Sequence, residues 1–297
     1  MIERTLHKGR ARLLYGAPNL ETLARLADDS VQCVVTSPPY FGLRRYGDGE
    51  QIGLEQTPEQ YIENLLAVFD SVRRVLKSNG TLWLNLGDSY KDKRLLGIPW
   101  RVALGLQGAG WYLRQDIIWH KPAPMPSSAK DRCTAAHEYI FLLTKSPSYL
   151  FNQMVEPSVT GERFHGGYEA TMGDGSKGHS RNGRNDADNY TATRNKRSVW
   201  TIGAQSYHGA HFAVFPEDLP RLAVAAGSNK GDLVLDPFSG SGTTGKVALQ
   251  LGRQYIGLDI NKEYIELALR RVDQFQPDTP TIDEEQGQQP LFRGIDE

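Results

Sequence analysis

The sequence has few cysteines and no long apolar run, and each shortage excludes a class of protein. Its 297 residues include only two cysteines, Cys33 and Cys133, too few for a disulfide framework or a cysteine-rich zinc site. No stretch approaches the ~20 apolar residues of a membrane-spanning helix, and the N-terminus lacks the apolar core of a signal peptide. We therefore expect a cytoplasmic protein without a metal site.

The net charge is also small, and the charged residues are distributed unevenly along the chain. The formal charge is −1, but from Gln276 onward six acidic residues stand against a single arginine, so the tail carries −5 and the remainder +4. A mildly basic body suits an anionic partner. The acidic tail, residues 276–297, is expected to be disordered because it has too little apolar surface to bury.

The apolar periodicity predicts a doubly wound α/β sheet. Near the C-terminus an apolar strand, a glycine-rich turn and a helix are followed by a second strand and helix, which is the βαβα order of such a sheet. The N-terminal half continues the same sheet, so the chain enters it in the middle, as in a circular permutation. The seven expected strands are 12–15, 31–36, 81–86, 112–119, 139–144, 232–235 and 254–258. The expected helices are 20–26, 58–76, 99–106, 243–251 and 262–274.

One long segment departs from this pattern. Residues 152–210 are rich in glycine and polar residues, have little apolar periodicity, and are basic in their second half. Such a stretch between two core elements predicts an inserted binding region, and its aromatic residues, Trp200 among them, favour a binding surface. The chain thus divides into residues 1–151 and 211–275 of one domain, the insertion 152–210, and the tail 276–297.

The segment from Asp236 to Thr244 reads Asp-Pro-Phe-Ser-Gly-Ser-Gly-Thr-Thr. It follows an apolar strand and opens a helix, so its glycines let the backbone approach a ligand near free N–H groups. Asp259 ends the next strand about twenty residues later, where an acidic side chain can bind two ribose hydroxyls. The segment lacks the third glycine of a dinucleotide loop and the lysine of a Walker loop. It therefore predicts a different nucleotide-cofactor site.

A second motif, Thr36-Ser37-Pro38-Pro39-Tyr40, ends an N-terminal strand. Two prolines fix the backbone and leave rigid carbonyl acceptors, and a serine hydroxyl beside them can also accept from an amino group. A tyrosine ring offers a face for a nucleobase, with stacking worth ~1–3 kcal/mol. Because both motifs follow strands of one sheet, we expect them at the same carboxyl edge.

The two motifs, in this order, resemble the beta class of amino-group DNA methyltransferases, in which the catalytic motif comes first, then a target-recognition region, then the cofactor motif. The resemblance covers about residues 10–275. It implies a Rossmann-like methyltransferase fold, S-adenosylmethionine as cofactor, double-stranded DNA as partner, and a target base flipped out of the helix. It also implies a prokaryotic or phage protein near the nucleoid, and leaves a homodimer and a cognate restriction endonuclease open as partners.

The resemblance also assigns roles to individual residues. The catalytic residues implied are Ser37, Pro38, Pro39 and Tyr40. The cofactor residues implied are Asp236, Phe238, Ser239, Gly240, Ser241, Gly242, Thr243 and Asp259, with His211 in a segment that encloses the methionine moiety. The basic residues of the insertion expected to contact DNA are Arg181, Arg184, Arg194, Lys196 and Arg197.

The motifs indicate the reaction more specifically than they indicate the atom that is methylated. Ser-Pro-Pro-Tyr is typical of family members that act on cytosine N4, whereas Asp-Pro-Pro-Tyr predominates among adenine N6 enzymes. We therefore favour cytosine N4, with adenine N6 as the alternative. No Pro-Cys pair is present, which disfavours a cytosine-C5 enzyme. A DNA-binding regulator with a decayed methyltransferase fold stays open as a minor alternative, and RNA stays open as a substrate.

Overall fold

The structure, a computed structural model, describes residues 1–42, 51–157, 193–203 and 216–273. The chain divides into a main unit, formed by Met1–Asn152 and Arg197–Thr279, and a second unit that includes Gln153–Lys196. His211, Arg181, Arg184 and the expected acidic tail lie outside the described residues.

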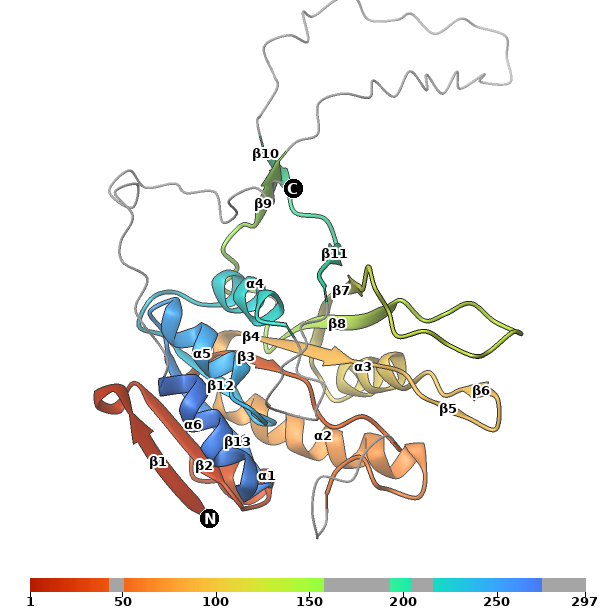
Figure 1. The fold of residues 1–297 in the computed structure, drawn as a ribbon. Coiled ribbons are helices and arrows are strands. Elements are labelled where there is room, and N and C mark those ends of the chain that lie inside the picture. Colours follow the sequence, from red (N-terminus) through yellow and green to blue (C-terminus); the bar gives the residue numbers. More distant parts are fainter. Residues whose placement is uncertain (43–50, 158–192, 204–215, 274–297) are drawn as a thin grey trace, which may run out of the picture. The chain divides into compact units, whose positions relative to one another are not determined.

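The main unit is built on one large sheet (Figure 1). Its strands are β1 (Ile2–Leu6), β2 (Ala11–Tyr15), β3 (Val31–Thr36), β4 (Leu76–Leu86), β7 (Tyr112–His120), β8 (His137–Thr144), β11 (Val199–Thr201), β12 (Leu233–Asp236) and β13 (Gln254–Asp259). Their order is β1-β2-β13-β12-β3-β4-β8-β7-β11. The five strands from β2 to β4 run parallel, whereas β8 is antiparallel to both of its neighbours. The expected permuted α/β sheet is confirmed.

The expected number of strands was wrong, because the described residues form a sheet of nine strands rather than seven. The two additional strands lie at its edges. β1 pairs with β2 but has an exposed centre, so it carries no apolar pattern. β11 is three residues long and pairs with β7, although its residues fall within the glycine-rich stretch. Trp200 of β11 is buried and stacks on Trp83 at 6.2 Å between ring centroids, so it belongs to the core rather than to an exposed binding surface.

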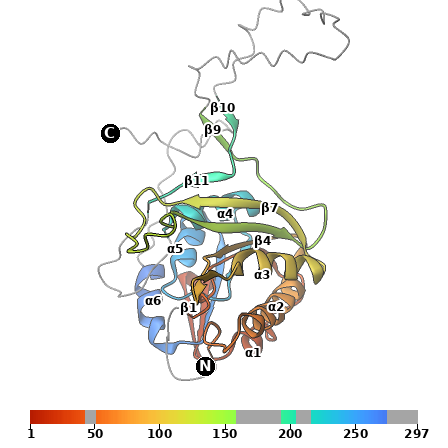
Figure 2. The same cartoon turned by 90° about the vertical axis from the view of Figure 1, so that its right-hand side faces the viewer.

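Helices cover both faces of the sheet (Figure 2). On one face lie α1 (Asn19–Leu23), α2 (Pro58–Val75) and α3 (Ile98–Gly108). On the other lie α4 (Asp218–Gly227), α5 (Thr243–Gln250) and α6 (Ile265–Asp273), the last preceded by the 3-10 turn η3 (Lys262–Tyr264). Another 3-10 turn, η1 (His7–Gly9), joins β1 to β2. No helix of the described residues is long and apolar enough to cross a membrane.

Helix α2 shows how local sequence fixes these elements. Thr57 caps its N-terminus by accepting the N–H of Gln60, and Pro58 occupies the first turn, where its missing N–H costs nothing. The side chains that face the sheet recur at helical spacing, and all are buried: Tyr61, Leu65, Val68, Phe69, Val72 and Val75. Burying side chains of this size stabilises the fold by ~1.5–3 kcal/mol each.

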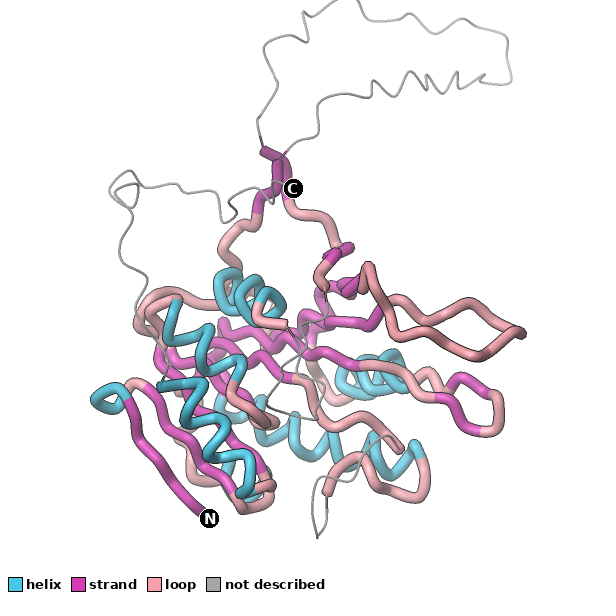
Figure 3. Tube along the Cα trace, viewed as in Figure 1, coloured by secondary structure: helices cyan, strands magenta, loops and turns pink. Residues whose placement is uncertain are grey.

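Two small hairpins lie outside the main sheet. β5 (Tyr90–Lys91) pairs with β6 (Arg94–Leu95) directly after β4 in the main unit (Figure 3). In the second unit, β9 (Val155–Pro157) pairs antiparallel with β10 (Thr193–Asn195).

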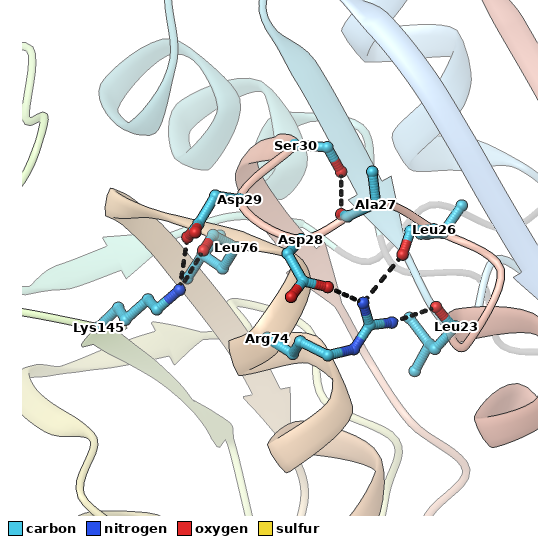
Figure 4. A network of polar contacts seen from close by, with 9 residues as sticks. All are labelled: Leu23, Leu26, Ala27, Asp28, Asp29, Ser30, Arg74, Leu76 and Lys145. Atoms are coloured by element: carbon cyan, nitrogen blue, oxygen red, sulfur yellow. Dashed lines mark hydrogen bonds and ion pairs between the residues drawn. The ribbon is translucent and has the colours of Figure 1, made fainter.

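A polar network fixes the connection that leads into β3 (Figure 4). The guanidinium of Arg74, at the end of α2, donates to the carbonyls of Leu23 and Leu26 at 2.7 and 3.0 Å and pairs with Asp28. Lys145, which follows β8, pairs with Asp29 at 2.6 Å. The start of β3, and hence the segment that follows it, is therefore held by α2 and β8.

The topology determines where a ligand binds. β12 lies between β13 and β3. The chain leaves β12 through α5 on one face, and it leaves β3 through α2 on the other face. Such a switch point, outside the carboxyl ends of the strands, is where open α/β sheets bind their ligands. The loops after β3 and β12 carry the two sequence motifs.

Candidate active site

A buried carboxylate joins the two motifs. Thr36, the last residue of β3, donates to Oδ1 of Asp236 at 2.7 Å, and Thr244 donates to Oδ2 at the same distance. The N–H of Phe238 also reaches Oδ1, at 3.0 Å. Burial raises the pKa of Asp236 to about 6, although the two threonine bonds oppose that rise. The Asp236 carboxylate, at the end of β12, therefore links the end of β3 to Thr244, and these hydrogen bonds are to protein groups.

The glycine-rich loop has one open side and one packed side. Gly240 and Gly242 have φ values of +48° and +78°, in the left-handed region that favours glycine. A Cβ placed on Gly240 would meet nothing within 4 Å, whereas one on Gly242 would lie 3.3 Å from Ala268 of α6. Gly242 thus permits close helix packing, and Gly240 presents bare backbone toward open space, where a ligand can approach.

Asp259 ends β13 beside this loop. Its Oδ2 accepts the N–H of Gly240 and its Oδ1 accepts the N–H of Asn261, each at 2.8 Å. Burial raises the pKa of Asp259 to about 6; the two backbone bonds oppose the rise, and the charge of Asp236 adds to it. The side chain is half-buried, and each oxygen keeps a lone pair. Asp259 is therefore held in place and still able to accept bonds from a ribose diol.

The loop hydroxyls turn toward the protein. Ser239 is buried between two tyrosines, at 2.9 Å from the hydroxyl of Tyr15 and 2.8 Å from that of Tyr255. Arg271 of α6 donates to Ser241 at 2.8 Å and to Thr243 at 2.6 Å. Phe238 packs against the core cluster. These expected cofactor residues brace the loop, and Tyr15, Tyr255 and Arg271, which support them, had no recognisable sequence pattern.

The Ser-Pro-Pro-Tyr segment begins where β3 ends. The Ser37 hydroxyl lies 3.4 Å from that of Tyr40, and the carbonyl of Pro39 accepts a bond from Tyr61 of α2 at 2.9 Å. The Tyr40 hydroxyl donates to Glu138 at 2.5 Å. Burial, followed by the charge of Glu138, raises the pKa of Tyr40 far above its usual range. Tyr40 is thus a neutral hydrogen-bond donor.

Asn85, Lys121 and Gly87 also help to hold Tyr40 in place. Asn85 of β4 donates to Glu138 at 2.9 Å, and Lys121 pairs with the other carboxylate oxygen of Glu138. Gly87 follows β4, and a Cβ placed there would lie 2.5 Å from the Tyr40 ring, so only glycine fits. Sequence reasoning missed Asn85, Lys121 and Glu138, because each belongs to a different strand or strand end and no local pattern connects them.

The basic residues expected to contact DNA are only partly described. Arg194 lies 2.9 Å from Glu156 and Lys196 lies 3.9 Å from it, so the β9–β10 hairpin gathers both around one carboxylate. Arg197 belongs to the main unit, and its carbonyl accepts the indole N–H of Trp200 at 3.1 Å. Among the described residues, no group of three or more histidine, cysteine or acidic side chains could hold a metal ion.

Relatives of this chain are Type II methyltransferases. It is 41% identical over 288 residues to the Type II methyltransferase M.Cfr9I of Citrobacter freundii, an alignment that covers 87% of each chain. It is 42% identical over 283 residues to the Type II methyltransferase M.SmaI of Serratia marcescens, which covers 85% of this chain and 87% of that relative.

Solved structures share the fold. The PvuII cytosine-N4-specific DNA methyltransferase superposes with a TM-score of 0.65 at 20% identity, over 92% of this chain and 89% of that one. The Thermus thermophilus protein TTHA0409, a candidate DNA modification methylase solved with S-adenosyl-L-methionine, gives a TM-score of 0.59 at 25% identity, over 89% of this chain and 97% of that one.

A family model for DNA methylases matches residues 31–270. The matched range begins at β3, ahead of Ser37, and ends in α6, beyond Asp259, so it includes both motifs and the strands that carry them. The chain therefore belongs to the N6/N4 DNA methylase family.

Proposed function

We propose that this protein transfers a methyl group from S-adenosylmethionine to the exocyclic N4 of cytosine in double-stranded DNA. The observation that carries the proposal is the Thr36–Asp236 bond of 2.7 Å, since it fixes the Ser-Pro-Pro-Tyr segment beside the glycine-rich loop. The serine at position 37 favours cytosine N4 over adenine N6. The relatives' Type II names also fit a protein that works beside a cognate restriction endonuclease.

The residues present fit the cofactor. Asp259 offers a half-buried carboxylate, held by two backbone N–H groups, for the ribose hydroxyls, and Gly240 offers bare backbone beside it. His211 and the other residues of its segment would complete the enclosure. When bound, S-adenosylmethionine supplies a methyl group on a positively charged sulfur. Support comes from the TTHA0409 structure, solved with this compound.

The catalytic segment suits an amino group as the acceptor. An exocyclic amine lies inside a base pair, so the target base must leave the helix to reach Ser37. The Ser37 hydroxyl and the Pro38 carbonyl would each accept one N–H of the amine, which aims its lone pair away from the ring. The Tyr40 face would support the base. Positioning of this kind, in a site without bulk water, provides most of the rate.

The insertion would select the DNA sequence. Arg194, Lys196 and Arg197, with Arg181 and Arg184, would divide between phosphate contacts, which position the protein, and base contacts, which specify the site. A homodimer would be a further way to bring two insertions to one duplex.

Nucleoside mass spectrometry tests the proposal. The purified protein is incubated with S-adenosylmethionine and unmethylated genomic DNA, and the digested DNA is analysed for methylated nucleosides. N4-methylcytosine is the expected product. N6-methyladenine would support the same methyl transfer but with adenine N6 as the target atom. Neither product, from a protein that demonstrably binds S-adenosylmethionine, would reject the function and favour a binding-only protein or an RNA substrate.

A further inference from the structure

Two loops outside the recognition insertion leave the sheet at the same edge as Ser37. The first, residues 88–97, follows β4 and contains the β5–β6 hairpin; the second, residues 121–136, joins β7 to β8 (Figures 1 and 3). We call residues 88–97 and 121–136 the edge loops. β4 and β7 both run parallel to β3, so all three strands end at one edge.

Both edge loops are attached at their bases to the catalytic segment. The Ser89 hydroxyl, at the start of the first loop, donates to the carbonyl of Phe41 at 2.9 Å. Lys121, at the start of the second loop, pairs with the Glu138 carboxylate that also receives the Tyr40 hydroxyl. The first loop is therefore anchored next to the residue that follows Tyr40, and the second is anchored to the carboxylate that positions Tyr40.

The edge loops carry a positive surface. They hold six basic residues, Lys91, Lys93, Arg94, Lys121, Lys130 and Arg132, against the three acidic residues Asp88, Asp92 and Asp131. Two of the acidic side chains are engaged within the loops, since Asp88 accepts the backbone N–H groups of Ser89 and Ile98, and Asp131 pairs with Arg132.

The remaining cations are available to a partner. Lys91, Lys93, Arg94 and Lys130 are all exposed, and within the described part of the chain they form no ion pair. Arg132 lies over the Tyr90 ring at 4.2 Å, so one cation holds the two loops side by side. The two loops are therefore in contact through Arg132 and Tyr90, and both carry exposed cations.

The turn of the hairpin supports a role for its charge. β5 and β6 are joined by Asp92 and Lys93, which have φ values of +51° and +63°. Two-residue hairpin turns of this kind strongly prefer glycine at the second position, because a side chain strains the left-handed backbone. The chain keeps a lysine there, which puts an ammonium group at the tip of the hairpin.

We propose that the edge loops bind the phosphate backbone of the DNA duplex beside the flipped base, as a contact surface separate from the insertion. The inference rests on the proposed function, because the partner is the duplex that brings the base to Ser37. Cations exposed next to a site that must admit nucleic acid match the charge of its backbone. Such contacts position the duplex without reading its sequence.

A pair of charge-matched variants tests this. The edge variant is Lys91→Ala/Lys93→Ala/Arg94→Ala, and the control is Arg4→Ala/Lys8→Ala/Arg270→Ala, which removes the same charge from exposed positions in β1, η1 and α6. Affinity for a labelled duplex is measured by fluorescence anisotropy across a range of KCl. We expect the slope of log K against log salt to fall by about 2 to 3 in the edge variant, with at least about tenfold weaker binding at 0.15 M salt. The control is expected to stay within about twofold of the wild type.

The single substitution Lys93→Gly distinguishes an effect of the lost charge on DNA binding from an effect of impaired folding. It relieves the strained turn, so the melting temperature should hold or rise while duplex affinity falls. This variant decides the question if the triple variant does not fold. Wild-type salt slope and affinity in Lys93→Gly and in the folded triple variant would overturn the inference and favour a protein partner for the edge loops.

The same preparations keep the two proposals apart. Methyl transfer is measured alongside binding, and in the edge variant the KM for DNA is expected to rise together with the Kd for the duplex. A wild type that methylates no DNA rejects the proposed function. A wild type that methylates DNA, with variants that bind the duplex as tightly, rejects the edge-loop contact alone.

Discussion

Thr36 and Asp236 are 200 positions apart in the chain and share one hydrogen bond of 2.7 Å. Thr36 ends β3 and directly precedes Ser37, and Asp236 ends β12 and opens the glycine-rich loop. The bond is buried at both ends, and Thr244 holds the second oxygen of the same carboxylate from α5. The catalytic segment and the cofactor loop are therefore positioned by one charged group.

Removing the Thr36 hydroxyl should loosen this connection. In Thr36→Val the side chain keeps its volume, but Asp236 loses a bond to a buried charge, which costs about 1.5–3 kcal/mol of unfolding free energy. The matched control is Thr22→Val, where a buried hydroxyl donates to a backbone carbonyl and the expected cost is about 1 kcal/mol. Urea denaturation measures both. Equal losses in the two variants would show that the Asp236 link carries no special weight.

Acid should stabilise the protein through Asp236 when no cofactor is bound. Its pKa is raised to about 6 in the fold, above the ~3.9 of an unfolded aspartate. Since the folded state binds the proton more tightly, the free energy of unfolding rises as the pH falls through 6 and levels off below about 4.

Asp236→Asn removes that proton uptake. The difference in unfolding free energy between wild type and variant should widen by about 1 kcal/mol between pH 7.5 and pH 5. Urea unfolding at both pH values gives the numbers, and a gap for Asp236→Asn that does not vary with pH would contradict a raised pKa.

The sequence predicts the long elements well. Strand β3 matches its expected range residue for residue, and α2 ends one residue earlier than expected, because buried strands and amphipathic helices leave patterns many residues long. β1 and β11 were missed, since three to five residues at a sheet edge bury too little to leave a pattern. The helix α4 was also missed: it is short, and Pro220 interrupts its sequence.

Side-chain partners within the site were harder to predict than its position. The two motifs locate the site because each follows a strand of the same sheet. Ser239, however, is held by Tyr15 and Tyr255, and Tyr40 by Glu138. These contacts arise from the register between strands that are far apart in sequence. The residues next to a tyrosine or glutamate at the end of a strand do not indicate which partner it will contact.

Ser37 should govern the methyl-transfer rate but not the affinity for the cofactor. In Ser37→Ala the amino group loses one of its two proposed acceptors, and losing such a contact at the reacting atom lowers kcat by about 10²–10³-fold. The Kd for S-adenosylmethionine, measured by isothermal titration calorimetry, should stay unchanged. Ser30→Ala is the control, because within the described part of the chain that hydroxyl bonds the local carbonyl of Ala27 alone. Wild-type kcat in Ser37→Ala would remove Ser37 from the mechanism.

Asp259 should make cofactor binding depend on pH. Only the carboxylate offers both oxygens to the ribose hydroxyls, and its pKa in the free protein is about 6. S-adenosylmethionine should therefore bind with constant affinity above pH 7 and progressively more weakly below pH 6, as protons compete for the group.

Two variants assign that pH dependence to Asp259. In Asp259→Asn the affinity should be about 10- to 150-fold lower, equivalent to losing about 1.5–3 kcal/mol of charged hydrogen bonding, and it should no longer vary between pH 5 and pH 8. Asp236→Asn should keep a pH dependence, displaced to lower pH, because the charge of Asp236 contributes to the raised pKa of Asp259 while the Asp236 oxygens themselves bond Thr36 and Thr244. Calorimetric titrations at four pH values distinguish these cases. A pH dependence that persists in Asp259→Asn and vanishes in Asp236→Asn would mean that protonation of Asp236, rather than of the ribose-binding Asp259, weakens cofactor binding.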